Sequence, residues 1–494
     1  MVMGSEYQSR LFIGGEFVDS WDGATIDVQD PHDGSYLTAI AEAKAEDVDR
    51  AVSAAAAAAP AWQRMSAADR GRLLLRLADA IEDEAESLAL LETRDTGHPI
   101  RDTRNLDVPR TAATFRYFGG MADKFQGSVV PVEPGFLDYV VPQPLGVVGQ
   151  IVPWNFPVMF CSWKMAPALA AGNTIVMKPS ELTPLSALRI GELMNEVGFP
   201  AGVVNIVPGY GATAGQRIVD HPGIAKVSFT GSTLVGRNIA RQAADTLKQV
   251  HLELGGKGAN IVFGDANIVA SVNGTAFGIF HNQGQACIAA SRLIIHESVV
   301  DEFLDRFIDL ARSIRVGDPK DGNTEMGPLT SAGHRDRVLS YVDLVREDGG
   351  DVLTGGRAPD ALDLADGYYI EPTVVKVDHR ARAACQEVFG PFMSVHTFST
   401  DEEALEIANS VDYGLGGGLW TKDLSRAHRM ARDLRAGMVW INSYKRVNPG
   451  SPFGGIGQSG YGREMGFEAM REYTEPKAVW VNVDAQLPPF YPRG

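Results

Sequence analysis

Short runs of β-branched and apolar residues alternate with helix-like stretches from about residue 147 onward, and this alternation is the strongest constraint on the fold. Strands that alternate with helices predict a parallel sheet with helices on both faces. The strand-like runs are GVVGQIV, NTIVMKP, GVVNIV, AKVSFT and QVHLEL, and the helix-like stretches lie near 157–170, 183–198, 212–220 and 232–243. A second series starts at NIVFGD, continues through SRLIIH and a helix near 298–314, and gains buried strands between 409 and 441.

Two helices are expected ahead of this region. One is Ala-rich and runs from Asp47 until it stops near Pro60. The other begins at Ser66, which is a good N-cap residue, and ends at Gly97, which favours the left-handed conformation of a helix end. Their apolar spacing indicates a packed face, so we interpret both helices as scaffold.

Three further segments read as extended chain. Residues 1–24 fit a strand pair, residues 126–146 are Pro-rich, and KAVWVNV near the C-terminus is strand-like. The last two segments, 126–146 and KAVWVNV, are exposed strands of a kind that favours pairing with another subunit. The same pattern fits edge strands within one chain, so the two interpretations remain open.

Composition and charge exclude several classes of function. The formal net charge is −17 and the pI is near 5.1, so nucleic acid and anionic membranes are poor partners. No stretch is long and apolar enough to span a bilayer, and the N-terminus has no basic start followed by an apolar block. Three cysteines in 494 residues do not form a disulfide framework, which favours a reducing, cytoplasmic setting.

Cys287 is the cysteine best placed for chemistry. It lies in FHNQGQACIAASR, where a helix ending near Asn282 leads through small residues into the strand SRLIIH. Small neighbours leave room for a substrate carbon to approach a thiolate. Cys161 lies on an apolar helical face and is interpreted as core. Spacing alone does not separate Cys287 from a small buried hydrophobe.

Polar residues at predicted strand ends add to this case. Glu253 ends the strand VHLEL, and a carboxylate there points into the crevice where parallel sheets bind ligands. Asn155 in VPWNFP stands where a strand ends and a helix begins, a position from which its amide can meet an oxyanion. Gly231 and Ser232 in FTGSTLVG open a helix whose free N–H groups suit phosphate.

Two other patterns are set aside. Gly455, Gly457 and Gly460 satisfy the G-x-G-x-x-G spacing, but they follow a Pro–Phe loop and open no βαβ unit. The ten histidines show no paired spacing such as H-E-x-x-H, so no metal is expected.

These motifs together resemble the aldehyde dehydrogenase superfamily over about residues 10–480. The matching stretches are PWNFP, TIVMKPSE, FTGST, LELGGK, NQGQAC, EVFGP and PFGGIGQSGYGREMG, in the usual order and at the usual separations. The resemblance implies an α/β protein with a Rossmann-type cofactor domain, an α/β catalytic domain and a β oligomerisation element. The expected ranges are 1–125 with 147–255 for NAD(P) binding, 256–455 for catalysis, and 126–146 with 456–494 for bridging into a homodimer or homotetramer.

The resemblance also assigns roles to residues. Cys287 is the nucleophile that forms a thiohemiacetal and then a thioester, Asn155 and the Cys287 N–H hold the oxyanion, and Glu253 is the base for hydrolysis. Glu181 beside the adenosine ribose favours NAD over NADP, although Lys178 leaves NADP possible. The residues implied in cofactor binding are Trp154, Lys178, Glu181, Gly231, Ser232, Glu387 and Phe389.

The substrate is less constrained. A tunnel is expected between Phe156, Met159, Trp163 and Ile288, with the 443–452 loop beside it, and its aromatic content favours a medium-sized apolar or aromatic aldehyde. Lys445 and Arg446 in that loop either meet a substrate carboxylate or face water. Two alternatives remain, which are a CoA-acylating semialdehyde dehydrogenase and a non-enzymatic binding or structural protein on the same fold. Intact Cys287, Glu253 and Asn155 argue against the second of them.

Overall fold

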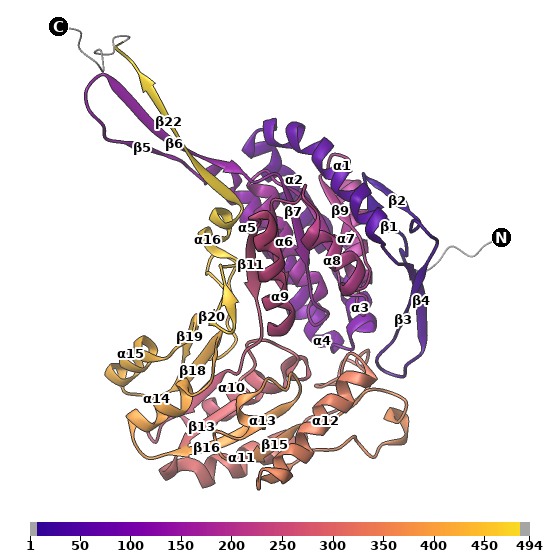
Figure 1. Cartoon of the computed structure of the whole chain (residues 1–494). Coiled ribbons are helices and arrows are strands. Elements are labelled where there is room, and N and C mark those ends of the chain that lie inside the picture. The colour runs from indigo at the N-terminus through magenta and orange to yellow at the C-terminus, as the bar shows by residue number, and fades with distance from the viewer. Residues whose placement is uncertain (1–6, 485–494) are drawn as a thin grey trace.

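A computed structural model describes residues 7–484, and its two large sheets confirm the expected α/β fold (Figure 1). The first sheet has eight strands in the order β2-β1-β9-β8-β7-β10-β11-β21. Its parallel centre consists of β7 (Val147–Ile151), β8 (Thr174–Lys178), β9 (Val204–Ile206), β10 (Lys226–Thr230) and β11 (Gln249–Glu253). Antiparallel strands flank it, namely β1 (Leu11–Ile13) with β2 (Glu16–Val18) at one edge and β21 (Gly460–Tyr461) at the other.

The order of these parallel strands places a switch point between β7 and β10. From β7 the chain proceeds through β8 to β9 on one side, and then returns to β10 and β11 on the other side. The loops that follow β7 and β10 therefore leave in opposite directions and open a crevice at the carboxyl edge of the sheet. This crevice is where a ligand of such a sheet is expected.

The second sheet has seven strands in the order β14-β15-β16-β13-β12-β18-β19. All neighbours in it are parallel except β14 and β15. Its strands are β12 (Ala259–Val262), β13 (Arg292–His296), β14 (Asp351–Thr354), β15 (Thr373–Lys376), β16 (Phe392–Phe398), β18 (Gly416–Trp420) and β19 (Met438–Ile441). The central ones are buried along their length, which explains their continuous apolar sequences.

Helices cover the faces of both sheets (Figure 1). Those that bear on the site are α5 (Val108–Met121), α6 (Pro157–Ala170), α7 (Leu185–Val197), α9 (Thr233–Ala243), α10 (Ile268–Phe280), α11 (Val300–Ser313) and α12 (Ala332–Glu347). Every residue of α6 is buried, because it lies between the first sheet and α5. Within residues 7–484 no helix is long and apolar enough to cross a membrane.

Two helix predictions need correction. α1 (Ala45–Arg64) continues through Pro60 instead of ending there, because Pro60 lies on the exposed face, where water can satisfy the carbonyl that loses its partner. The helix expected between Ser66 and Gly97 is two helices, α2 (Ala67–Asp83) and α3 (Ala85–Thr96), separated at Glu84. Its ends are as expected, since Ser66 accepts a hydrogen bond from the N–H of Asp69 and Gly97 has φ of 77°.

A three-stranded antiparallel arm extends away from the body of the molecule (Figure 1). It is formed by β5 (Ser128–Val130), β6 (Phe136–Pro144) and β22 (Thr474–Asn482), so the two extended segments pair within one chain. Its role in oligomerisation and the domain boundaries stay predictions. Residues 1–6 and 485–494, which fall in the expected domains, lie outside the described residues.

A buried ion pair joins α6 to the segment that precedes the arm. Lys164 Nζ contacts Glu464 Oε1 and donates to Ser228 Oγ at 2.9 Å, and the side chains of Lys164 and Glu464 are 0% and 2% exposed. Attraction between the two charges offsets the cost of removing both from water.

We predict that Lys164→Met destabilises the protein by about 3–5 kcal/mol, because it leaves Glu464 buried without its cation. Thermal unfolding measures the change. Arg346→Met, which removes the cation of an exposed pair with Asp343, is the control and should cost less than about 1 kcal/mol. Equal losses of stability in the two variants would contradict this account of the pair.

Candidate active site

The predicted polar residues gather at the carboxyl edge of the first sheet. Lys178 and Glu253 are the last residues of β8 and β11. Asn155 follows β7, and Gly231 with Ser232 follows β10. Because β7 and β10 flank the switch point, the loops that carry Asn155 and Gly231 border the same crevice.

A strained turn delivers Cys287 to this crevice from the part of the chain that leads into the second sheet. After α10 ends at Phe280, Asn282 and Gln283 adopt left-handed conformations with φ of 52° and 54°, and Gly284 follows with φ of 69°. Non-glycine residues in this region cost roughly 1–3 kcal/mol each, so the surrounding structure must hold them there. A side chain at Gly284 would place Cβ 2.0 Å from the Gly390 carbonyl oxygen, so no other residue fits.

Buried hydrogen bonds hold the turn in place. Asn282 Nδ2 donates to the Asn155 carbonyl at 2.8 Å, and Gln283 Nε2 donates to the carbonyls of Gly97 and Pro328 at 2.8 and 3.0 Å. Asn155 Nδ2 returns a bond to the Gln285 carbonyl at 2.8 Å. The loop of Asn155 and the turn before Cys287 are therefore fixed to each other, although Asn155 and Gln285 are 130 positions apart in the sequence.

Cys287 lies where two cavities meet. One is a cleft whose lining includes Trp154, Asn155, Gly231, Ser232, Glu387 and Phe389. The other is narrower, has mostly apolar walls and is lined by Phe156, Met159, Phe160, Trp163, Phe277, Ile288, Val447 and Phe453, together with the polar residues Arg110, His281 and Lys445. Cys287 lines both. Molecules in the two cavities can thus meet at its sulfur.

The electrostatics of Cys287 favour the neutral thiol before a substrate binds. Burial raises the pKa of the thiol, and the negative charges of Glu253 and Glu387 raise it further. The ammonium group of Lys445 acts in the opposite direction. The nucleophilic thiolate is therefore a minor species at neutral pH, and a base that removes the proton would accelerate attack.

Glu253 is a buried carboxylate whose surroundings make it a stronger base than usual. Its side chain is 2% exposed, with Oε1 3.7 Å from His251 Nε2. Burial raises its pKa well above the usual value and the charge of Glu464 adds to the rise, whereas Lys164 and Arg463 lower it. Its neighbours Leu254 and Gly255 line the cleft, although Glu253 itself is not among the lining residues.

The cleft combines free N–H groups with an aromatic wall. Ser232 caps α9, its Oγ accepting from the N–H of Val235, so the first turn of that helix opens at the cleft. The rings of Trp154 and Phe389 lie edge to face with centroids 5.3 Å apart. Glu387 Oε1 accepts from the N–H of Gly256 at 2.8 Å, and burial raises the pKa of this carboxyl to about 7.

Lys178 and Glu181 do not line the described part of the cleft. Lys178 Nζ donates to the carbonyls of Pro179 and Gly209, both at 2.8 Å, and lies 3.3 Å from Glu181 Oε2. The lysine is buried and the Glu181 side chain is 29% exposed. The structure thus joins these two residues to each other, and their role toward a nucleotide stays a prediction.

Several cavity residues escaped the sequence analysis. His334 packs on Trp154, with ring centroids 5.0 Å apart, and its Nε2 lies 2.7 Å from the Phe389 carbonyl oxygen. His281 and Arg110 line the apolar cavity. The residues next to them in the sequence form no motif that would have predicted a place in the site. Lys445 is 4% exposed, so the idea that it faces water is wrong, whereas Arg446 is exposed.

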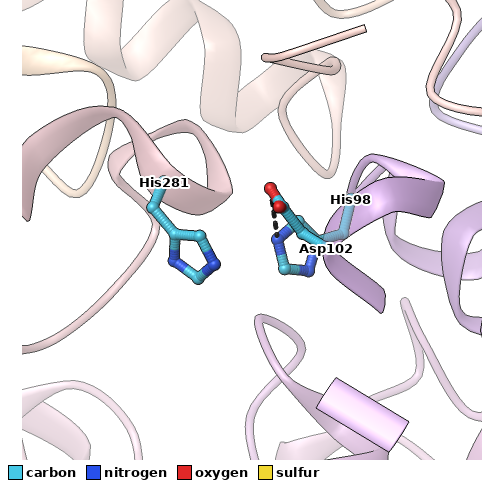
Figure 2. A group of neighbouring side chains, drawn as sticks. All are labelled: His98, Asp102 and His281. Carbon is cyan, nitrogen blue, oxygen red and sulfur yellow. Dashed lines mark ion pairs between the residues drawn. The ribbon is translucent and has the colours of Figure 1, made fainter. Parts of the chain in front are cut away.

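Figure 2 shows that His98, Asp102 and His281 turn toward one another, and His281 also lines the apolar cavity. Their potential ligand atoms lie within 4.8 Å of one another, a grouping of the kind that can hold a metal ion. Asp102 and His281 are 179 positions apart in the sequence (from 102 to 281). A search for metal ligands at short, regular spacing therefore does not find this group.

The site thus joins a cysteine, an apolar cavity and a cleft with a helix N-terminus, and comparison with known proteins specifies the family. The model of the aldehyde dehydrogenase family matches residues 17–479. The mitochondrial aldehyde dehydrogenase of Rattus norvegicus is 45% identical over 480 residues, covering 96% of this chain and 92% of that protein. The chain belongs to the aldehyde dehydrogenase family and is an oxidoreductase, as its motifs predicted.

Solved structures agree with this assignment. The crystal structure of PnpE in complex with nicotinamide adenine dinucleotide is 66% identical, with a TM-score of 0.98, and covers 98% of this chain and 100% of that one. The NAD+ complex of an aldehyde dehydrogenase from Bacillus cereus is 43% identical, with a TM-score of 0.94 and 96% of each chain covered.

The raised pKa of the Cys287 thiol yields a test. Because the pKa lies above the usual value, the thiolate fraction at neutral pH is small, and the rate of alkylation by iodoacetamide should rise roughly tenfold per pH unit between about pH 6 and pH 9. Mass spectrometry of the Cys287 peptide measures this rate. The fully buried Cys161 serves as the internal control and should stay unmodified. A rate for Cys287 that levels off below pH 7 would contradict the assignment.

Proposed function

We propose that this protein oxidises a medium-sized aldehyde to the free carboxylic acid with NAD+, through a thiohemiacetal and then a thioester on Cys287. The observation that carries this proposal is that Cys287 lines both the apolar cavity and the cleft. A nucleophile at that junction can bind the aldehyde carbon from one side while a hydride acceptor occupies the other.

The cleft fits a dinucleotide. It offers the N-terminus of α9 for phosphate, aromatic walls at Trp154 and Phe389, and the carboxylate of Glu387 as an acceptor for ribose hydroxyls. Glu181 would accept from the adenosine ribose, and Lys178 lies beside it. When bound, NAD+ supplies the acceptor for the hydride that leaves the substrate carbon.

The first half of the reaction belongs to Cys287 and Asn155. The thiol of Cys287 releases its proton to solvent, and attack of the resulting thiolate on the carbonyl carbon turns the aldehyde oxygen into an oxyanion. The Asn155 amide donates one N–H to the Gln285 carbonyl and keeps its second for this oxyanion, beside the backbone N–H of Cys287. Donors of this kind contribute about 10²–10³ in rate. Loss of hydride from the adduct leaves a thioester on Cys287.

The second half belongs to Glu253. A carboxylate with a raised pKa is a stronger base, suited to taking a proton from the water that attacks the thioester. Hydrolysis releases the acid and returns the thiol. A buried carboxylate near the sulfur supports hydrolysis over transfer to coenzyme A, which remains the alternative within this family.

The surroundings of the site bear on substrate and assembly. Phe156, Met159, Trp163 and Ile288 wall an apolar passage that suits a medium-sized or aromatic aldehyde. The arm exposes Val129 and Trp480, which are 70% and 56% accessible, and this favours pairing into a homodimer or homotetramer. We place the protein in the cytoplasm, on the small number of cysteines.

The division of roles between Cys287 and Glu253 can be tested by transient kinetics. Glu253→Gln should keep a first turnover of NADH formation and then slow by at least about 10²-fold, because the thioester accumulates. Cys287→Ser should lose the first turnover as well. A Glu253→Gln variant with no first turnover would show that this residue acts before hydride transfer.

The cofactor preference can be tested at Glu181. Removing its charge with Glu181→Gln should improve kcat/KM for NADP+ relative to NAD+ by about tenfold, because a 2′-phosphate would no longer meet a carboxylate. Steady-state kinetics with both cofactors measures the ratio. Glu192→Gln, on α7 and outside the described cleft, is the control. An unchanged ratio in Glu181→Gln would remove Glu181 from the ribose site.

A further inference from the structure

Positive charge is concentrated in the apolar cavity. Arg110, His281 and Lys445 line it together with Cys287, and none of the described residues that line it is acidic. An apolar aldehyde would gain nothing from two cations in its binding cavity. Their presence therefore indicates that a bound ligand supplies a negatively charged group to this cavity.

Lys445 is the clearer of the two cations. It follows β19 in a left-handed conformation with φ of 55°, and its side chain is directed into the interior, where only 4% of the residue is exposed. The hydrogen bond found for its ammonium group is a long one, 3.4 Å, to the His281 carbonyl. An ammonium group has three donors, and burial lowers the pKa of Lys445 to about 7, so a bound anion would favour the charged form at neutral pH.

Arg110 on α5 is half-buried and is a second basic residue in the cavity lining. The acidic groups near it already have partners. Asp107 Oδ2 lies 2.6 Å from His98 Nδ1, and Asp102 lies 3.4 Å from Arg101 Nε and 3.8 Å from His98 Nε2. The guanidinium group of Arg110 is thus left with donors that a bound anion can use.

The same charges argue against a metal at the group in Figure 2. A divalent cation on His98, Asp102 and His281 would be repelled by Lys445 and Arg110, whose positive charges already lower the pKa of His281, after burial as the main cause. A neutral His281 is instead able to donate a hydrogen bond to an anion. The apolar cavity thus has hydrogen-bond donors from Lys445, Arg110 and His281, which is the composition expected of a site that binds an anion.

We propose that Lys445 and Arg110 form a subsite for a carboxylate at the far end of the aldehyde, so that the substrates are ω-oxo acids. This inference rests on the proposed function, because it places the aldehyde carbon at Cys287. The apolar walls then hold the carbon chain or unsaturated body between the two polar ends. The two cations select against aldehydes that lack the distal charge.

Wild-type protein with NAD+ provides the first test. The probes are 4-oxobutanoate, 5-oxopentanoate, 6-oxohexanoate and 7-oxoheptanoate, each compared with the unsubstituted aldehyde of the same chain length. At least one acid should have kcat/KM roughly 10- to 100-fold above its neutral counterpart, which is the size expected for charge-assisted hydrogen bonds. Preference for the neutral aldehyde throughout the series would overturn the proposal.

Variants then locate the subsite. Lys445→Met and Arg110→Gln should each lower the ratio of kcat/KM for the preferred acid to kcat/KM for the neutral aldehyde of the same length about tenfold or more, because any effect on the thiol is common to both substrates and only the acid loses a charged partner. Arg116→Gln, on α5 with Arg110 but exposed and paired to Asp79 and Glu82, is the charge-matched control and should leave both substrates unchanged. Equal losses for acid and neutral aldehyde would show that the cations act on the thiol or on folding.

Two further measurements separate the possible failures. Inhibition of the wild type by the dicarboxylate of the preferred chain length should be at least about tenfold stronger than by the monocarboxylate, and this needs no variant to fold. Equal inhibition would overturn the subsite. Cys287→Ser should lose oxidation of the neutral aldehyde, which tests the proposed function alone. If this variant kept the activity, the mechanism would be refuted, whatever the result for the subsite.

Discussion

The site depends on the turn at residues 281–284, which holds two non-glycine residues in the left-handed region. This conformation brings the sulfur of Cys287 from the second sheet to the crevice of the first sheet. Reciprocal hydrogen bonds with Asn155 and bonds from Gln283 to distant carbonyls offset the strain. Cys287 and Asn155, the proposed nucleophile and oxyanion donor, are consequently positioned by one network, so that displacement of either would move the other.

Burial of charge is the second theme of the site. Glu253, Glu387 and Cys287 are surrounded by protein, and in each the loss of water is the largest cause of a raised pKa. The Lys164–Glu464 pair also acts on Glu253, the proposed base. Glu464 raises the pKa of Glu253, and Lys164 lowers it. The reactivity of the site is thus linked to the ion pair that joins α6 to the C-terminal segment.

The sequence was most informative where local pattern and fold coincide. The strands of the parallel sheet and α6, at 157–170, follow from apolar runs and the residues that bound them. The continuation of α1 through Pro60 and the break at Glu84 did not follow, because solvent exposure and packing decide whether an interrupted helix goes on. Family motifs located Cys287, Asn155 and Glu253, whose catalytic roles remain proposals.

The walls of the cavities were less accessible from the sequence. His334, His281 and Arg110 reach the site through tertiary packing, and their local sequences do not distinguish them from ordinary surface or core residues. For Lys445 the sequence left open whether it faces water or a substrate. Its burial excludes the first, because the loop that carries it lies against the turn after α10.

The most direct test of the account is to trap the acyl group. Glu253→Gln protein incubated with an aldehyde and NAD+ should carry, on the peptide that contains Cys287, an added mass equal to the aldehyde less two hydrogens. Without NAD+ that mass should be absent, because a thioester requires the loss of hydride. An acyl group found on another residue, or none found while aldehyde is still oxidised, would contradict the assignment of Cys287 as the nucleophile.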